Sequence, residues 1–252
     1  MGQLYYFQLL VILAYNLFMK SSIQDKPKLV NSVFSKVYRK YDFMNDVMSL
    51  GIHRIWKNKL IDWMNPQPDE NLIDVASGTG DIAKLFSKKN NNLSNISCVE
   101  PNDQMFSVGK LNLEKFQNIK WYKAKAEKLP FKNDTYNFYT ISYGIRNVSD
   151  INLSLKEAFR VLKPGGRFMC LEFSKIDNEI INLFYEQYSK VIPVFGKYIV
   201  GSSEPYNYLT KSIKEFHTQN QLVDLIKKNG FSNVEYRNLS NGISAIHSGW
   251  KI

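Results

Sequence analysis

A short apolar strand followed by a tight glycine turn restricts the possible folds of this chain more than any other feature of its sequence. The run Leu72–Ala76 predicts a buried parallel strand, Gly78-Thr79-Gly80 predicts a tight turn, and residues 81–88 predict the helix that follows. The glycines at 78 and 80 leave no Cβ in the way of a ligand close to the backbone. The segment therefore predicts a nucleoside-bearing cofactor over the carboxyl ends of a parallel sheet.

An acidic residue at the end of the next predicted strand supports this prediction. Residues 96–99 form a second apolar run, and Glu100 follows it directly. A carboxylate at that place can accept hydrogen bonds from both hydroxyls of a ribose. Gly78, Gly80 and Ala83 also fit the fingerprint of the nicotinamide dinucleotide enzymes, and such turns occur without any ligand. The turn alone leaves these alternatives open.

The composition indicates one globular domain with a membrane surface as the favoured partner. The 252 residues, 44% of them hydrophobic, are enough for one α/β domain with a modest appendage and exclude a disordered chain. The net charge of +10 comes from scattered basic residues, and no nucleic-acid-binding motif is visible, so we expect no nucleic-acid partner. Cys98 and Cys170 lie in apolar runs, which favours a reducing compartment over disulfides or a metal site.

The first 25 residues predict an extension outside the core, and residues 26–252 predict a single domain. The run Leu4–Met19 is strongly apolar, but it is short for a membrane span and contains Gln8 and Asn16. It also lacks the basic start and the cleavage site of a secretory signal. A membrane-associated segment, a degenerate import signal and a stretch without function all remain open, and we favour the first two.

A helical prelude over residues 27–63 carries more polar groups than packing requires. Within it, residues 40–57 mix aromatic and methionine side chains with Tyr41, Asp42, Asn45 and His53. This mixture is typical of an apolar pocket with a few orienting polar groups. For His53, a capping or structural role is the alternative to a catalytic one.

Two further segments follow the predicted strands 119–122 and 136–142. After the first come Lys125 and Ala126, where a small residue followed by an acid can accommodate an adenine; an ordinary loop is the alternative. The second ends at Ser142 and is followed by Arg146, at the crevice where doubly wound sheets bind ligands.

The C-terminal third predicts an insertion and a closing hairpin. Residues 163–166 predict a turn before a strand over 167–173, and the aromatic-rich residues 176–212 predict a helical lid over an apolar substrate, with additional core as the alternative. Thr218 opens a capping box for the last helix, and residues 234–248 predict two antiparallel strands.

The order of these elements is similar to the Rossmann-like, seven-stranded, mostly parallel α/β sheet of the class I S-adenosylmethionine-dependent methyltransferases, which ends in an antiparallel hairpin. Four segments resemble more narrowly the UbiE/COQ5 family of ubiquinone and menaquinone biosynthesis C-methyltransferases. These segments are residues 40–57, 74–81, 141–148 and 245–251. The resemblance extends from about residue 28 to the C-terminus.

The resemblance implies S-adenosylmethionine as the methyl donor and assigns residues to it. Thr79 would contact the donor in the glycine turn, Glu100 its ribose, Lys125 and Ala126 its adenine, and Ser142 its methionine end. The other donor-binding candidates are Gly78, Gly80 and Asp74, with Asp81 as a second choice that can instead meet the helix N-terminus. Two positions depart from the family pattern, because Glu100 replaces a commoner Asp and Lys125 replaces a commoner Asn.

The implied acceptor is a polyprenyl benzoquinol of the 2-methoxy-6-polyprenyl-1,4-benzoquinol type, methylated on a ring carbon. Loss of a proton from a ring hydroxyl makes that carbon electron-rich, and Arg146 is the candidate stabiliser of the resulting oxyanion, with a structural salt bridge as its alternative. Tyr41, Asp42, Asn45 and His53 are candidates to orient the ring or relay the proton. The chemistry requires no metal.

A long-tailed substrate implies a membrane surface, other ubiquinone-biosynthesis proteins or a second copy of the chain as partners. We expect a peripheral protein on the matrix side of the mitochondrial inner membrane, with the bacterial cytoplasm at the membrane as the alternative. The rival functions are a methyltransferase for another aromatic or lipid acceptor and a non-catalytic scaffold of a quinone-synthesising complex.

Overall fold

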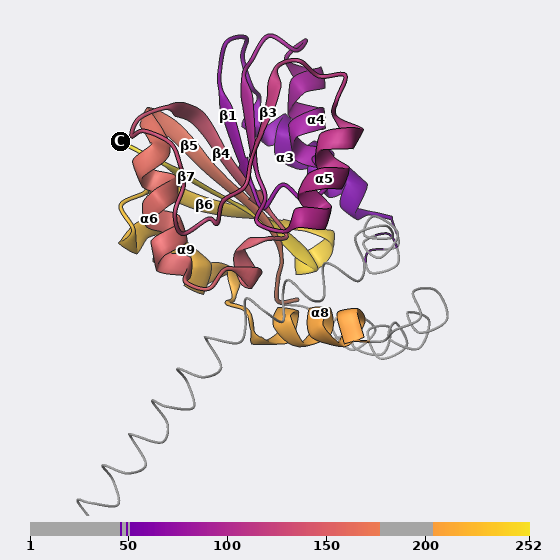
Figure 1. Cartoon of the computed structure of the whole chain (residues 1–252). Helices are drawn as coiled ribbons and strands as arrows, with labels where there is room; N and C mark the ends of the chain where they lie inside the picture. The colour runs from indigo at the N-terminus through magenta and orange to yellow at the C-terminus, as the bar shows by residue number, and fades with distance from the viewer. Residues whose placement is uncertain (1–45, 47–48, 50, 177–203) are drawn as a thin grey trace, which may run out of the picture.

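The computed structural model describes residues 46, 49, 51–176 and 204–252, and these form a seven-stranded sheet between helices (Figure 1). The strand order is β3-β2-β1-β4-β5-β7-β6. Strands β1 to β5 are parallel, whereas β7 runs antiparallel to both β5 and β6. The strands are β1 (Leu72–Val75), β2 (Ile96–Val99), β3 (Ile119–Tyr122), β4 (Tyr136–Ser142), β5 (Leu162–Phe173), β6 (Ser232–Leu239) and β7 (Ser244–Trp250). The predicted fold class is therefore confirmed.

The helices cover both faces of the sheet. One layer holds α3, α4 and α5, the other holds α6 and α9, and α8 lies apart from both at one end of the sheet (Figure 1). The helices are α3 (His53–Met64), α4 (Asp81–Lys89), α5 (Asp103–Asn112), α6 (Ile151–Val161), α8 (Glu204–Glu215) and α9 (Gln219–Lys228), with short 3-10 turns η2 (Ile145–Asn147) and η3 (Ser240–Gly242). None of the described helices combines the length and the apolar character needed to cross a membrane.

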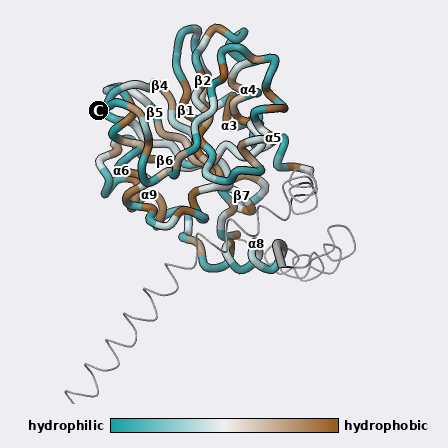
Figure 2. The backbone as a smooth tube through the Cα atoms, in the orientation of Figure 1, coloured by the Kyte–Doolittle hydropathy of each residue, from teal (hydrophilic) through white to brown (hydrophobic). Residues whose placement is uncertain are grey.

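Two apolar cores, one on each face of the sheet, explain why the central strands are apolar throughout. Neighbouring residues of a strand point to opposite faces, so Leu72 packs in the core under α3 and α4, while Ile73 packs in the core under α6 and α9. Each fully buried side chain of this size contributes about 1.5–3 kcal/mol to folding. Figure 2 shows hydrophilic and hydrophobic residues interspersed along α4 and α9, as expected for helices that bury one face only.

Most of the predicted element boundaries agree with the structure, including those of β2, β3 and β4 and the capping box at Thr218. The prediction of a strand beginning at Arg167 was wrong, because β5 already begins at Leu162. The register explains the difference. Tyr136 pairs with Leu162 and Phe138 with Arg167, so residues 163–166 bulge out of a continuous strand instead of preceding it.

The C-terminal ends of the parallel strands lie level with one another. In the sheet, Val75 of β1 is paired with Val99 of β2 on one side and with Ile141 of β4 on the other. The chain reverses its direction of winding between β1 and β4, which is where open α/β sheets bind their ligands. The architecture thus places the glycine turn, Glu100 and Ser142 along one edge.

Candidate active site at the ends of the parallel strands

The glycine turn after β1 requires backbone conformations that few residues other than glycine adopt. Gly78 and Gly80 have φ angles of 56° and 89°, and Gly80 is the N-cap of α4. Ser77 stabilises the start of the turn, because its hydroxyl group donates a hydrogen bond to the carbonyl oxygen of Asp74 at 2.6 Å. A Cβ on Gly80 would lie 2.5 Å from the Leu113 side chain, so this glycine is needed for the packing of the turn against its neighbours.

The neighbouring helix α5 packs so closely against this turn that it also needs a glycine. A Cβ on Gly109 would lie 2.9 Å from the carbonyl oxygen of Gly78 and 2.2 Å from the Trp121 ring. We expect Gly109→Ala to lower the free energy of unfolding by about 1–3 kcal/mol, because α5 must move away from the turn. Urea denaturation measures this, with Lys110→Ala, an exposed change on the same helix, as the control. Equal stability of the two variants would contradict the prediction.

Glu100 ties the end of β2 to the glycine turn and is itself buried. Its two carboxylate oxygens accept hydrogen bonds from the backbone N–H groups of Gly78 and Asn102, both at 2.9 Å. Burial raises the pKa of Glu100 to about 7, although these two hydrogen bonds act in the opposite direction. A carboxylate has about four acceptor positions, so these two hydrogen bonds do not use the full acceptor capacity of Glu100.

Asp74 points into the same region from β1 with one acceptor unused. Its Oδ1 accepts a hydrogen bond from the Thr140 hydroxyl at 2.7 Å. Its Oδ2 is buried and has no hydrogen-bond partner among the residues that the structure describes. Burial raises the pKa of Asp74 to about 7, and the hydrogen bond from Thr140 opposes the rise. A buried acceptor without a partner indicates a place for a donor group of a ligand.

A small pocket lies between the ends of β1 and β4, and Asp74 is in its walls whereas Glu100 is not. Its walls are formed by Lys57, Asp74, Ala76, Ser77, Gly78, Thr79, Asp81, Ile82, Ser142 and Tyr143. Four of the predicted donor-binding residues, Asp74, Gly78, Thr79 and Ser142, are therefore side by side. Lys57 was not predicted, since nothing in the sequence indicates that α3 lies against the glycine turn.

The walls of this pocket contain two strained residues. Ala76, after β1, and Tyr143, after β4, have φ angles of 54° and 55°, a conformation that costs about 1–3 kcal/mol for a residue with a Cβ. The two strand ends are in contact, because a Cβ on Gly144 would lie 2.6 Å from that of Ala76. Such strain is typical of sites in which backbone geometry is fixed for function.

Lys125 and Ala126 occupy the next part of the same edge, after β3, and are not in the walls of this pocket. Lys125 is exposed and bridges to Lys128 through its backbone, while Ala126 is buried in the core under α6. The acid that follows them, Glu127, accepts a hydrogen bond from the backbone N–H of Ser149 at 2.6 Å. Its carboxylate thus holds the loop before α6.

Arg146 forms a buried ion pair at the ends of β4 and β5. The exposed fractions of the side chains of Arg146 and its partner Glu172 are 4% and 1%. One guanidinium nitrogen donates to Glu172 and also to the carbonyl oxygen of Tyr143 at 3.0 Å. Burial raises the pKa of Glu172, and the charge of Arg146 opposes the rise. The salt bridge that the sequence left open as an alternative is present, and its carboxylate partner was not predicted.

Helix α8 joins the predicted insertion to this ion pair. The Tyr208 hydroxyl donates to Oδ1 of Asn147 at 2.9 Å, and the Asn147 amide donates to the Tyr143 carbonyl oxygen at 3.2 Å. Leu209 is buried in the core under α3. The described part of the insertion therefore packs against η2, next to Arg146, whereas residues 177–203 lie outside the described residues.

His53 is held in a polar cluster at the start of α3. Its Nδ1 lies 2.9 Å from the Ser49 hydroxyl and 3.6 Å from a carboxylate oxygen of Asp46. Burial, followed by the nearby charge of Lys57, lowers the pKa of His53 to about 4, so its ring is neutral at pH 7. The other candidates of this segment, Tyr41, Asp42 and Asn45, lie outside the described residues. Within the described part of the chain, no group of three or more His, Cys, Asp or Glu side chains could hold a metal ion.

Comparison of the sequence with known proteins identifies the family to which this chain is similar. The model of the ubiE/COQ5 methyltransferase family matches residues 20–251. A Rickettsia bellii protein named ubiquinone/menaquinone biosynthesis C-methyltransferase UbiE is 49% identical over 242 residues, which cover 93% of this chain and 97% of the relative. A Brucella suis protein of the same name is 43% identical over 234 residues, covering 90% of this chain and 87% of the relative.

Solved structures share the fold at low sequence identity. A SAM-dependent methyltransferase from Thermotoga maritima superposes with a TM-score of 0.62 at 20% identity and covers 88% of this chain and 99% of its own. A phosphoethanolamine N-methyltransferase from Haemonchus contortus, solved with S-adenosylhomocysteine, gives a TM-score of 0.59 at 12% identity and covers 78% of this chain and 52% of its own. These likenesses identify the sheet and its helices as a methyltransferase fold.

Proposed function

The chain belongs to the ubiE/COQ5 methyltransferase family and is an S-adenosylmethionine-dependent C-methyltransferase of ubiquinone biosynthesis, and on this basis we propose a role in the reaction for each residue of its site. The acceptor is a polyprenyl benzoquinol of the 2-methoxy-6-polyprenyl-1,4-benzoquinol type. The observation that supports the proposal best is the pocket at the reversal between β1 and β4, in which Asp74, Gly78, Thr79 and Ser142 meet.

The residues around this pocket fit the donor. Glu100 has acceptor capacity beyond its two backbone hydrogen bonds for ribose hydroxyls, and Asp74 has a buried oxygen without a hydrogen-bond partner among the described residues. Thr79 and Ser142 lie in the walls of the pocket, between the turn and the end of β4. S-adenosylmethionine, when bound, supplies a methyl carbon activated by a positive sulfur. The chain holds the donor and aligns the acceptor carbon, and alignment alone is worth about 7–11 kcal/mol of the barrier in favourable cases.

Arg146 acts on the acceptor side. A guanidinium group is a cation with hydrogen-bond donors only, so Arg146 is suited to stabilise a quinol oxyanion and not to remove the proton. His53 is also a poor proton acceptor near pH 7, because its pKa is about 4 and Ser49 lies at its Nδ1. We assign to His53 the positioning of the segment before α3. Tyr41, Asp42 and Asn45 orient the ring and relay the proton of its hydroxyl group to solvent.

Transfer of a labelled methyl group tests the acceptor class directly. The wild-type protein is expected to methylate a reduced 2-methoxybenzoquinone with a short prenyl tail and to leave sterols and catechols unmethylated. Methylation of a sterol or catechol instead would establish the rival acceptor class. Tight binding of S-adenosylhomocysteine without methyl transfer to any acceptor would favour the rival function, a non-catalytic scaffold of a quinone-synthesising complex. A reduced naphthoquinone in a parallel reaction separates a ubiquinone precursor from a menaquinone precursor.

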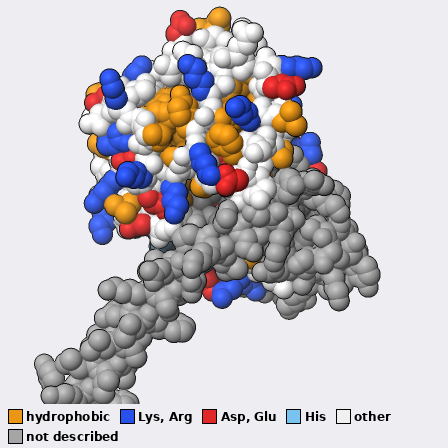
Figure 3. All heavy atoms as spheres, in the orientation of Figure 1, with side chains coloured by type: hydrophobic (Ala, Val, Ile, Leu, Met, Phe, Trp, Pro, Cys, Tyr) orange, Lys and Arg blue, Asp and Glu red, His pale blue; other side chains and the backbone are white. Residues whose placement is uncertain are grey.

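We also propose that the protein collects its acceptor at a membrane surface, together with other ubiquinone-biosynthesis proteins or a second copy of the chain. The net charge of +10 favours an anionic surface, and Figure 3 shows lysine and arginine side chains spread over the face in view. The placement on the matrix side of the mitochondrial inner membrane rests on residues 1–25 as a targeting or membrane-associated extension. Mass analysis of the mature N-terminus tests whether this extension is removed.

Donor binding is expected to depend on pH. Burial raises the pKa of Glu100 and that of Asp74 to about 7, and each carboxyl accepts hydrogen bonds on both oxygens only when it is ionised. The affinity for S-adenosylhomocysteine should therefore fall as the pH drops below about 7, by up to about tenfold per pH unit for each group that must lose its proton. Calorimetry at about pH 6 and about pH 8 measures this, and equal affinities would contradict the assignment of both carboxylates to the donor.

A further inference from the structure

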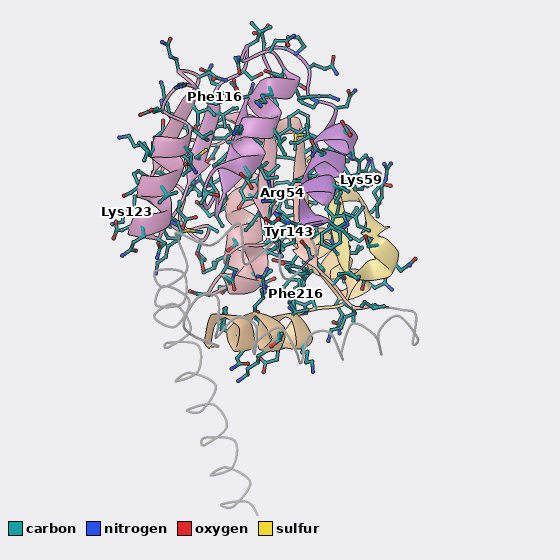
Figure 4. All side chains as sticks on the ribbon, turned by 90° about the vertical axis from the view of Figure 1, so that its right-hand side faces the viewer. Arg54, Lys59, Phe116, Lys123, Tyr143 and Phe216 are labelled. Atoms are coloured by element: carbon teal, nitrogen blue, oxygen red, sulfur yellow. The ribbon has the colours of Figure 1, made fainter. Side chains whose placement is uncertain are left out.

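The donor pocket contains a buried lysine that neither the glycine turn nor the core requires. The side chain of Lys57 comes from α3 and is only 8% exposed, and its Nζ lies 2.6 Å from a carboxylate oxygen of Asp81 in the first turn of α4. Burying an ammonium group is costly unless it is paired. Two positions further along α3, Lys59 is exposed, as is usual for a lysine on a helix of the outer layer (Figure 4).

The position of Lys57 is more informative than its burial. Together with Asp74 and Asp81 it forms part of the wall of the pocket. The partner Asp81 has an exposed fraction of 41%, so solvent reaches the carboxylate more easily than the ammonium. The fold therefore keeps the ammonium group of Lys57 beside the glycine turn, and Oδ2 of Asp74, which has no hydrogen-bond partner among the described residues, in the same small space.

We propose that Lys57 and Asp74 bind the two charges of the amino-acid end of the donor, with Lys57 at its carboxylate and Asp74 at its ammonium. The proposal rests on the function above, which requires a donor with both groups. Lys57 is a donor-binding residue in this assignment, and it takes no part in the methyl transfer because it contacts the donor at a group that does not react. Asp81 holds the ammonium of Lys57 in place from the side of α4.

The charges of pocket and donor are complementary. The two aspartates and the lysine give the pocket a net charge of about −1 when all are ionised. The amino-acid end of S-adenosylmethionine is neutral overall, and its sulfur is positive, so the donor restores neutrality. S-adenosylhomocysteine lacks the sulfonium charge but keeps both groups that Lys57 and Asp74 would bind. A ligand without the amino-acid end, such as methylthioadenosine, would leave the buried lysine and aspartate unmatched.

Calorimetric titration with three ligands tests the assignment. The ligands are S-adenosylhomocysteine, its decarboxylated form, and methylthioadenosine. Lys57→Met is expected to weaken binding of S-adenosylhomocysteine about 10- to 100-fold and to leave the other two affinities unchanged. Asp74→Asn should weaken binding of the first two ligands, which carry the ammonium, and spare methylthioadenosine. Lys59→Met, on the exposed side of the same helix, should change none of the three affinities.

The outcomes separate this inference from the proposed function. If the wild-type protein binds S-adenosylhomocysteine but Lys57→Met weakens all three ligands equally, or none of them, the assignment of Lys57 is wrong and the methyltransferase function stands. If the wild-type protein binds none of the three ligands, both fail. If Lys57→Met does not fold, Lys57→Arg replaces it in the test, because arginine keeps the positive charge. Lys57→Arg is expected to retain the preference for S-adenosylhomocysteine over the decarboxylated ligand. Loss of that preference in folded Lys57→Arg would also overturn the assignment.

Discussion

Replacing Glu100 by glutamine is expected to weaken the binding of S-adenosylhomocysteine about 100-fold, because two hydrogen bonds from ribose hydroxyls to a charged acceptor are lost or weakened. The amide also disturbs the site itself. Both carboxylate oxygens of Glu100 accept backbone N–H groups, from Gly78 and from Asn102. A glutamine can present an oxygen to only one of them, so its NH₂ group must face the other donor.

The matched control keeps the charge and shortens the side chain. Glu100→Asp should bind S-adenosylhomocysteine more tightly than Glu100→Gln does, since the carboxylate can still accept from the ribose. Calorimetry gives both affinities, and thermal denaturation without ligand separates loss of binding from loss of fold. Binding by Glu100→Gln at the wild-type affinity would falsify the assignment of Glu100 to the ribose.

The sequence predicted the part of the site that lies at the C-terminal ends of the parallel strands β1, β2 and β4. Gly78, Thr79 and Glu100 could be placed because a parallel strand, a glycine turn and an acid after the next strand have a fixed spatial relation in this architecture. Ser142 followed from the same rule, applied to β4. The structure places Gly78, Thr79 and Ser142 in the walls of one pocket, and Glu100 is hydrogen-bonded to Gly78 beside it.

The groups that the sequence did not predict are those that depend on contacts between distant segments. Lys57 meets Asp81 only because α3 packs against α4, and Glu172 meets Arg146 only because β5 lies beside β4. Glu172 sits in an apolar strand as a single acid, which a sequence pattern cannot distinguish from an exposed residue. The roles given to Tyr41, Asp42 and Asn45 stay predictions.

Replacing Arg146 by methionine is expected to lower the free energy of unfolding by about 3–5 kcal/mol, because Glu172 would remain in the core as an unpaired charge. Methyl transfer should also be lost. The single variant cannot separate the two effects, since a protein that loses this much stability also loses activity. The buried pair therefore has to be removed as a whole, and apolar side chains of similar size are the best replacement for such a pair.

The double variant Arg146→Met/Glu172→Met tests whether Arg146 serves the reaction or only the fold. With both charges gone, no unpaired charge is left in the core, and we expect the stability to return to within about 1–2 kcal/mol of wild type. Methyl transfer should remain about 100- to 1,000-fold below wild type, because the stabiliser of the oxyanion is missing. Binding of S-adenosylhomocysteine should be close to that of wild type, since Glu100 and Asp74 are intact.

A second ion pair provides the control. Lys89 of α4 and Asp62 of α3 form a surface pair with exposed fractions of 47% and 65%. Lys89→Met/Asp62→Met should leave methyl transfer near the wild-type rate. A folded Arg146→Met/Glu172→Met protein that methylates the quinol as fast as this control would show that Arg146 contributes to stability alone. In that case the oxyanion would need another stabiliser, and Asn147, which holds Tyr208 next to the ion pair, would be the first residue to examine.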